Sequence, residues 1–330
     1  MRRTILALVA LVACRDRTPE PPPPPPPLED GVTLIQPGAT PAHTLRYHPT
    51  RGARTTSELT YDFDVKDDGQ GNPMPTLVVE LETAVDDVLA DGTAKLRITV
   101  IRTRVRDHAG APGADSLLGD EAVGMLGVVI TEMLAPDGKV WDAHLEVPAA
   151  VPDKVRAEID RVSQGLERVA MRLPTEPVGV GATWRERRTL PEGGIRAISE
   201  TTYRLVSITG DTIAYATTGL STGAPQTVEQ DGTKVEVTDT HGHVEAQGTL
   251  DLARYAFDLA STSTFSSTMT VVAPEGTPGA GASTVEVTMA IQLRPPAASP
   301  AQDPPADAGR SAAAPASGST PSPHGAHKAP

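Results

Sequence analysis

The chain has 330 residues, a formal net charge of −13 and only 3% aromatic residues. An acidic chain lacks the clustered Lys and Arg that phosphate contacts need, so nonspecific nucleic-acid binding is excluded as a leading function. The scarcity of aromatic residues predicts a core of Val, Leu, Ile and Ala. It also disfavours the stacking platforms of proteins that bind sugars or nucleic acids.

Residues 1–13 have the pattern of an export signal. Two arginines precede an uncharged apolar run from Ile5 to Ala13, which is shorter than the roughly 20 residues that span a bilayer. The run ends in Leu-Val-Ala-Cys and resembles the lipobox of bacterial lipoprotein precursors, which implies that Cys14 is acylated and becomes the mature N-terminus. Cys14 is the only cysteine of the chain, and an orphan thiol in an oxidising compartment would invite intermolecular pairing. An ordinary export signal with an incidental cysteine is the alternative.

This N-terminus predicts a protein that is anchored to a membrane and does not span it. Removing residues 1–13 takes away two arginines and no acid, so the net charge of −13 becomes −15. Such a charge disfavours binding to anionic lipid through the protein surface, and the acyl chains, at about 0.8 kcal/mol per buried CH₂, would supply the membrane affinity. Arg15, rather than an acidic residue, follows the cysteine, which favours the outer membrane, facing the periplasm, over the inner membrane.

Segments poor in apolar residues flank the part expected to fold. Residues 14–42 contain seven consecutive prolines, Pro21 to Pro27, and proline-rich chain forms a semi-rigid polyproline II spacer. A stalk is therefore expected here, with a ligand for a proline-binding module as the alternative. Residues 295–330 are mostly Ala, Pro, Ser, Gly and Asp, so this tail is expected to be disordered.

The first β-rich half is predicted over residues 43–151. Residues 56–65 alternate apolar and polar side chains, as a strand with one buried face does. Residues 77–85 and 94–105 are predicted to form a hairpin across the turn dipeptide Asp91-Gly92. Residues 125–134 are rich enough in apolar side chains for a buried helix, but their glycines favour a hairpin that continues into residues 139–147.

One amphipathic helix is predicted over residues 152–173. Its apolar residues recur at steps of three and four, which gives a single stripe along one face. Pro152 and Asp153 suit its start, and Pro174 follows its end. This helix is expected to pack on one side of a sheet or to bridge two sheets.

Strands resume over residues 174–294, which form the second predicted β half. The fold class is therefore mostly β, or α+β, with antiparallel sheet in two halves, one helix and disordered tails. A half-barrel and a sandwich both remain open at this point.

The stretch from Leu173 to Trp184 contains Leu-Pro and then Pro-Val-Gly-Val-Gly-Ala-Thr-Trp. It resembles a pattern of uncharacterised, predicted bacterial lipoproteins, in which a helix ends in Leu-Pro and a Pro-Val-x-Val-Gly-x-x-Trp turn leads into a second β half. The resemblance implies this architecture and supplies no chemistry. Considered as residues, Gly179 and Gly181 permit tight backbone geometry, and Trp184 supplies a large apolar anchor at the start of a strand. All three are interpreted as structural.

A metal site is the sharpest chemical hypothesis in the sequence. Asp239, His241, His243 and Glu245 alternate along a predicted strand and would share one face. Imidazole and carboxylate groups are ligands of zinc and other transition metals, so His241, His243 and Glu245 are candidate metal ligands. Neighbouring side chains on one face lie about 7 Å apart, which is far for a single ion without a bulge. A solvated strand face is the alternative.

Enzymatic activity has little support in the sequence. The chain has no cysteine other than Cys14, and its Gly-x-Ser-x-Gly match, Gly219 to Gly223, follows a predicted strand. No helix is predicted after this match, whereas a nucleophile elbow leads from a strand into a helix. No catalytic residues and no cofactor are therefore predicted. Two functions remain. The first is a membrane-anchored carrier or binding module for an apolar or lipid-like ligand, and the second is a structural or protein-interaction domain of the cell envelope without a small-molecule ligand.

Overall fold

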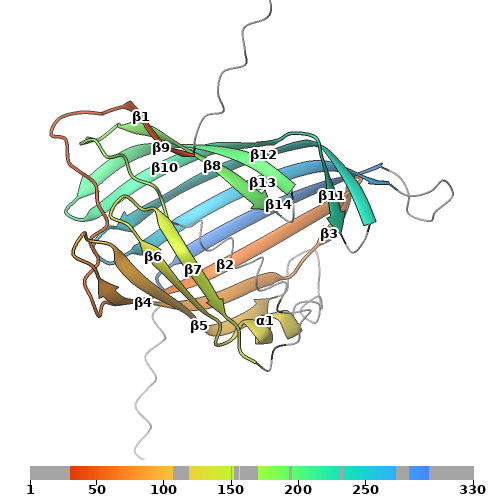
Figure 1. The fold of residues 1–330 in the computed structure, drawn as a ribbon, viewed down its shortest axis with the longest axis horizontal. Coiled ribbons are helices and arrows are strands. Elements are labelled where there is room, and N and C mark those ends of the chain that lie inside the picture. The colour runs from red at the N-terminus through yellow and green to blue at the C-terminus, as the bar shows by residue number, and fades with distance from the viewer. Residues whose placement is uncertain are drawn as a thin grey trace, which may run out of the picture.

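The chain folds into one large antiparallel sheet. The computed structural model describes residues 30–106, 119–149, 151, 156, 170–192, 195–230, 233–272 and 282–296. Fourteen strands belong to the sheet, and a short helix, α1 (Gly119–Met125), lies beside it (Figure 1). The predicted mostly β fold class is confirmed.

The strands follow one another as hairpins over most of the chain. They are β1 (Gly31–Gln36), β2 (Arg54–Asp67), β3 (Gln70–Pro73), β4 (Thr76–Val88), β5 (Ala94–Arg106), β6 (Val129–Leu134), β7 (Val140–Glu146), β8 (Thr183–Glu192), β9 (Ile195–Thr209), β10 (Thr212–Gly223), β11 (Gln226–Gln230), β12 (Thr233–Asp251), β13 (Ala256–Val272) and β14 (Ala282–Arg294). The order across the sheet is β1-β8-β9-β10-β12-β13-β14-β2-β4-β5-β6-β7, and β11 and β3 pair additionally with β12 and β2.

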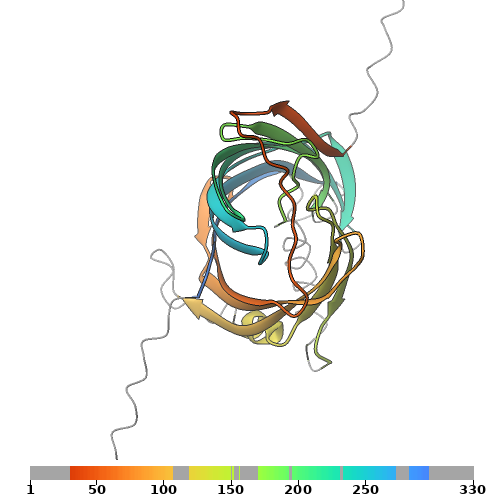
Figure 2. The ribbon, with the colours of Figure 1, turned by 90° about the vertical axis from the view of Figure 1, so that its left-hand side faces the viewer.

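The two predicted β halves lie side by side in the sheet. Strands β2 to β7 form one block and β8 to β14 the other, and the pairing of β14 with β2 joins them from Val285↔Asp67 to Arg294↔Glu58. Figure 2 shows that the sheet curls round on itself, so that it has a concave and a convex face. The structure is therefore one strongly curved sheet rather than two sheets packed face to face.

The boundary of the predicted stalk is wrong at its C-terminal side. Residues 31–36, which lie within the predicted stalk of residues 14–42, form β1, which pairs with β8. Val32 and Leu34 pack against the core, and the carboxylate of Asp30 accepts hydrogen bonds from the backbone N–H (2.9 Å) and hydroxyl (3.1 Å) of Thr189. The alternation of Val32 and Leu34 is too short to be recognised beside a long proline run. Residues 14–29 lie outside the described part.

The predicted hairpin of β4 and β5 is confirmed. Its turn contains Gly92 with a φ of 84°, and Asp91 accepts a hydrogen bond of 2.9 Å from the backbone N–H of Thr93. This bond, together with one from the Thr93 side chain, lowers the pKa of Asp91. The side chains of β5 alternate between two faces, since Leu96 is fully buried while Lys95 and Arg97 are exposed.

The hairpin predicted over residues 125–147 begins later than expected. Strands β6 and β7 pair antiparallel, as predicted, but Met125 is the last residue of α1. Gly127, with a φ of 79°, reverses the chain between helix and strand, and its N–H donates to the carbonyl of Val100 at 2.9 Å. A seven-residue helix carries too little periodicity to be seen in the sequence.

The predicted helix over residues 152–173 falls mostly outside the described residues. Its last four residues, 170–173, are described and are not helical. The reason is visible in their hydrogen bonds, because the side chains of Tyr47, Trp184 and Arg188, from other parts of the chain, donate to their carbonyl groups in place of helical N–H donors. The predicted disordered tail of residues 295–330 is described only at residues 295 and 296.

Much of the core lies at one end of the curved sheet, which we call the packed end, and Ala122 and Met125 of α1 belong to the same core. The segment between β1 and β2 runs across this end (Figure 2), and Leu45 and Tyr47 of this segment are buried. In the part of the chain that the structure describes, no helix has the length and apolarity needed to cross a membrane. The largest fully buried side chains are Trp184, Tyr47, Leu96, Leu134, Leu173, Leu205, Ile213, Leu250, Glu132, Val78, Val79 and Val178.

Candidate functional site

The strand register arranges the concave face in rows that run across the sheet. One row close to the packed end, the tryptophan row, is Trp184, Tyr203, Thr217, Ala246, Ser261, Ile291 and Tyr61. The next, the glutamate row, is Glu186, Thr201, Gly219, Val244, Ser263 and Met289. The third, the arginine row, is Arg188, Ser199, Ser221, Gly242, Phe265 and Val287.

Aromatic side chains close the packed end. Trp184 has no exposed surface and stacks on Tyr203 with a centroid distance of 5.4 Å and an interplanar angle of 15°. Tyr255 makes edge contacts with Tyr47 at 5.6 Å and with Phe257 at 5.2 Å. Few aromatic residues exist in this chain, and most of the described ones gather here, so they supply much of the buried area at this end.

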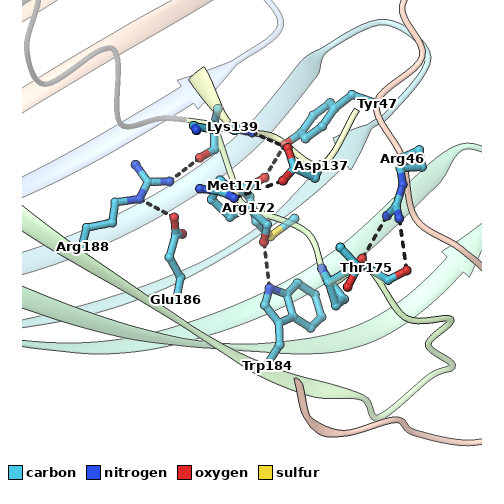
Figure 3. A network of polar contacts seen from close by, with 12 residues as sticks. Arg46, Tyr47, Asp137, Lys139, Met171, Arg172, Thr175, Trp184, Glu186 and Arg188 are labelled. Carbon is cyan, nitrogen blue, oxygen red and sulfur yellow. Dashed lines mark hydrogen bonds and ion pairs between the residues drawn. The ribbon is translucent and has the colours of Figure 1, made fainter. Parts of the chain in front are cut away.

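An irregular segment, residues 170–175, lies among these side chains and is held by residues from three other parts of the chain: the segment before β2, the turn between β6 and β7, and β8 (Figure 3). Tyr47 donates its hydroxyl to the Met171 carbonyl at 3.0 Å, and the Trp184 indole N–H donates to the Arg172 carbonyl at 2.9 Å. Asp137 forms an ion pair of 3.0 Å with Arg172. These contacts satisfy buried backbone groups that no strand or helix pairs, so the segment behaves as part of the core.

A polar cluster lies on the concave face directly beyond the aromatic residues. Glu186 is 3% exposed, and it accepts hydrogen bonds from Arg188 Nε and, at 3.0 Å, from the Tyr203 hydroxyl. Burial and the neighbouring Glu186 carboxylate raise the pKa of Tyr203 well above its ordinary value, so the phenol remains a proton donor. Arg188 Nη2 also donates to the Ala170 carbonyl at 2.8 Å, while 26% of the Arg188 side chain is exposed.

Apolar side chains that are only partly buried continue the concave face away from the packed end. Phe257 and Leu250 of the packed end are buried, whereas Val244, Phe265 and Met289 farther along the same face are partly exposed. The convex face of the same strands carries exposed polar side chains such as Thr262. We call the concave residues Val244, Ala246, Phe265, Val287, Met289 and Ile291 the apolar wall.

A small cavity lies within the packed end. Its volume is ≈ 60 Å³, and Leu59, Leu293, Tyr255 and Phe257 are among its lining residues. Liquid water occupies about 30 Å³ per molecule, so this cavity has the size of a few waters and is too small for an acyl chain.

The three candidate metal ligands project from the convex face of β12. His241, His243 and Glu245 are all exposed, and His243 Nε2 lies 3.2 Å from a Glu245 carboxylate oxygen. A bulge follows Thr238, and Asp239 adopts a φ of 51° there. Across the described residues, no group of three or more His, Cys, Asp or Glu side chains is placed to hold a metal ion. Metal binding by this strand remains a prediction, and titration with Zn²⁺ would test it.

The residues interpreted as structural lie where two segments cross. A Cβ atom on Gly179 would stand 1.6 Å from the carbonyl oxygen of Ala39, and Gly181 has a φ of 84°. Both glycines immediately precede β8, which begins beside the buried Trp184. Cys14, the predicted lipidation site, lies outside the described residues.

Glu186 and Arg188 were not foreseen as members of a site. The run from Trp184 to Arg188 places charged residues on both faces of the strand, and the pattern alone does not tell which face is concave. The spacing could have indicated their position, because Glu186 and Arg188 lie two and four residues after Trp184. Residues at this spacing in a strand share one face, so both lie on the face of the predicted apolar anchor.

Comparisons with known proteins give little further information. No family model matches the chain, and no curated protein matches it. Among solved structures, the chain is similar to one described as "Lipid-protein interactions in lipovitellin", with 13% sequence identity and a TM-score of 0.38. The similarity covers 76% of this chain and 26% of that one, so the chain spans about a quarter of the length of that protein.

Proposed function

We propose that this protein is a non-catalytic carrier or binding module of the cell envelope, anchored to a membrane through lipid on Cys14, and that it holds the apolar part of a lipid-like ligand. The export signal and its lipobox pattern support the anchor, and Arg15, which follows the cysteine in place of an acidic residue, supports a position at the outer membrane, facing the periplasm. The ligand proposal rests on the apolar wall.

The observation that carries the proposal is the change in burial along one face of β12, β13 and β14. At the packed end this face is buried, but along the apolar wall it is only partly buried although it faces inward. Removing apolar surface from water is favourable by about 25 cal/mol of free energy per Å². An acyl chain lying against Val244, Phe265 and Met289 would gain that free energy without disturbing the packed end.

Small residues adjoin the apolar wall and leave room for a ligand beside it. Ser221 and Gly242 in the arginine row, and Gly219 in the glutamate row, place little side-chain volume beside the apolar residues. A flexible chain can pack against such a surface without displacing large side chains. The alternative function, an envelope interaction domain, requires no ligand on this face.

Native mass spectrometry of residues 30–330, purified from bacterial cells, tests the proposal. A co-purifying lipid, or a mass increase after incubation with phospholipid vesicles, would support the carrier function. The matched variants are Ser263→Trp, which adds volume beside the apolar wall, and Thr262→Trp, which adds it to the convex face of the same strand. Loss of the ligand in S263W alone is expected. A bare chain mass under all conditions would contradict the proposal and leave the interaction domain, whose partner crosslinking would identify.

A further inference from the structure

We propose that Arg188, together with Glu186, binds the polar end of the ligand, and that this end is an uncharged hydrogen-bond acceptor such as an ester or hydroxyl group. This inference rests on the proposed function, because it concerns the same concave face. It assigns the ligand class as neutral amphiphiles, of which monoacylglycerols and diacylglycerols are examples.

The first argument is the number of donors that Arg188 still offers. A guanidinium group carries five N–H donors. In the described structure, Arg188 donates from Nε to Glu186 and from Nη2 to the Ala170 carbonyl. The remaining donors belong to a side chain that is 26% exposed, while the carboxylate that holds it is 3% exposed. Glu186 and the Ala170 carbonyl thus orient the guanidinium group, which retains N–H donors for a ligand.

The second argument is charge. Arg188 and Glu186 form an ion pair, and the Tyr203 phenol that bonds to Glu186 is uncharged. A carboxylate or phosphate ligand would add a negative charge beside a pair that is already balanced, in a place that is largely removed from water. Such an uncompensated charge is costly to desolvate, whereas an ester carbonyl or a hydroxyl accepts a hydrogen bond at much lower cost. The balance therefore favours a neutral polar group.

The third argument is the position of Arg188 relative to the apolar wall. Arg188 lies in the same row as Phe265 and Val287, with Ser199, Ser221 and Gly242 between them. Neighbouring strands lie about 4.8 Å apart, so the path from β8 to β13 is about 19 Å along the curved sheet. A long acyl chain covers this distance when extended. One molecule can therefore place its polar end at Arg188 and its apolar end against the wall.

The test compares amphiphiles that share one acyl chain and differ in their polar end. Monooleoylglycerol, oleate and oleylamine are titrated into the chain without its signal, and binding is followed by isothermal calorimetry. We expect monooleoylglycerol to bind at least tenfold more tightly than oleate. Arg188→Met is expected to weaken monooleoylglycerol about tenfold or more, because a hydrogen bond to a charged group is lost. Arg185→Met is the matched control, since Arg185 lies on the convex face of the same strand and pairs with Glu200 at 3.5 Å.

Glu186→Gln supplies a readout that a merely structural role would not change. This variant keeps the shape of the side chain but leaves the Arg188 charge unbalanced, so the preference is expected to shift toward oleate. Arg188→Lys keeps the positive charge if Arg188→Met fails to fold. Binding of oleate more tightly than monooleoylglycerol by the wild-type chain, or an unchanged preference in E186Q, would overturn the assignment of Arg188 while leaving the carrier function. If none of the three amphiphiles binds, the carrier function and this inference both fail.

Discussion

At the scale of single residues, the structure depends on close backbone contacts that only glycine permits. Gly179 is the clearest case, because its Cα faces the carbonyl group of Ala39 across the crossing of two segments. Gly38 lies at the same crossing, where a Cβ would stand 2.3 Å from the Gly179 carbonyl oxygen. These contacts fix the segment that follows β1 against the residues that lead into β8.

The substitution Gly179→Ala is expected to destabilise the fold. A methyl group at 1.6 Å from the Ala39 oxygen forces the backbone to move, and overpacking of this kind costs about 1–3 kcal/mol or more. The free energy of unfolding in urea measures the effect. Gly71→Ala is the control, since nothing lies within 4 Å of its added Cβ. Equal stability of the two variants would show that the crossing is looser than described.

Single residues also show what the sequence could and could not predict. The burial of Trp184 agrees with its interpretation as an anchor. A large apolar side chain at the start of an alternating strand is most stable on the buried face. The burial of Glu186 was not predicted, because its partners Arg188 and Tyr203 are brought to it by strand pairing. A pairing between β8 and β9 is a tertiary contact, and one strand's pattern does not specify its neighbour.

At the scale of elements, hairpins were predicted best and isolated elements worst. The β4–β5 hairpin could be predicted because its turn dipeptide and both alternating strands are local in sequence. Strand β1 could not be predicted, because its partner β8 follows about 150 residues later and only the two strands together form a ladder of hydrogen bonds. The same reason explains the irregular segment 170–175, whose conformation is set by Tyr47, Trp184 and Arg188.

Strand β1 is expected to protect the edge of the sheet formed by β8. A chain that starts at Pro37 lacks β1 and Asp30, so the edge of β8 would present unpaired backbone groups and invite pairing with a second copy. We expect this truncation to lower the urea midpoint and to form dimers or larger species in size-exclusion chromatography with light scattering. A chain that starts at Asp30 is the control and is expected to remain monomeric at the same concentration. A stable, monomeric truncation would show that β1 is dispensable.

For the molecule as a whole, the curved sheet buries its tyrosines and the Glu186 carboxylate in the same core. All five tyrosines of the chain have a raised pKa, and burial is the largest cause in each case. Tyr203 is further raised by Glu186, and Tyr255 by Glu132. The tyrosines are distributed over β2, β9, β10 and the segments beside β2 and β13, so their protonation reports on the integrity of the whole core.

Alkaline pH is therefore expected to unfold the protein cooperatively. A group whose pKa is raised in the folded state contributes stability that is fully present below its unfolded pKa, about 10 for tyrosine, and that is lost as the pH rises above it. With five such groups, the free energy of unfolding is expected to fall by up to about 7 kcal/mol per pH unit above that point. Tyrosinate absorbance and circular dichroism should change together in a single steep transition. The variant Tyr215→Phe, which removes one titrating group, should make the loss of stability with pH less steep. Ionisation of several tyrosines at a pH where the circular dichroism is still native would contradict the burial of these phenols and the closure of the packed end.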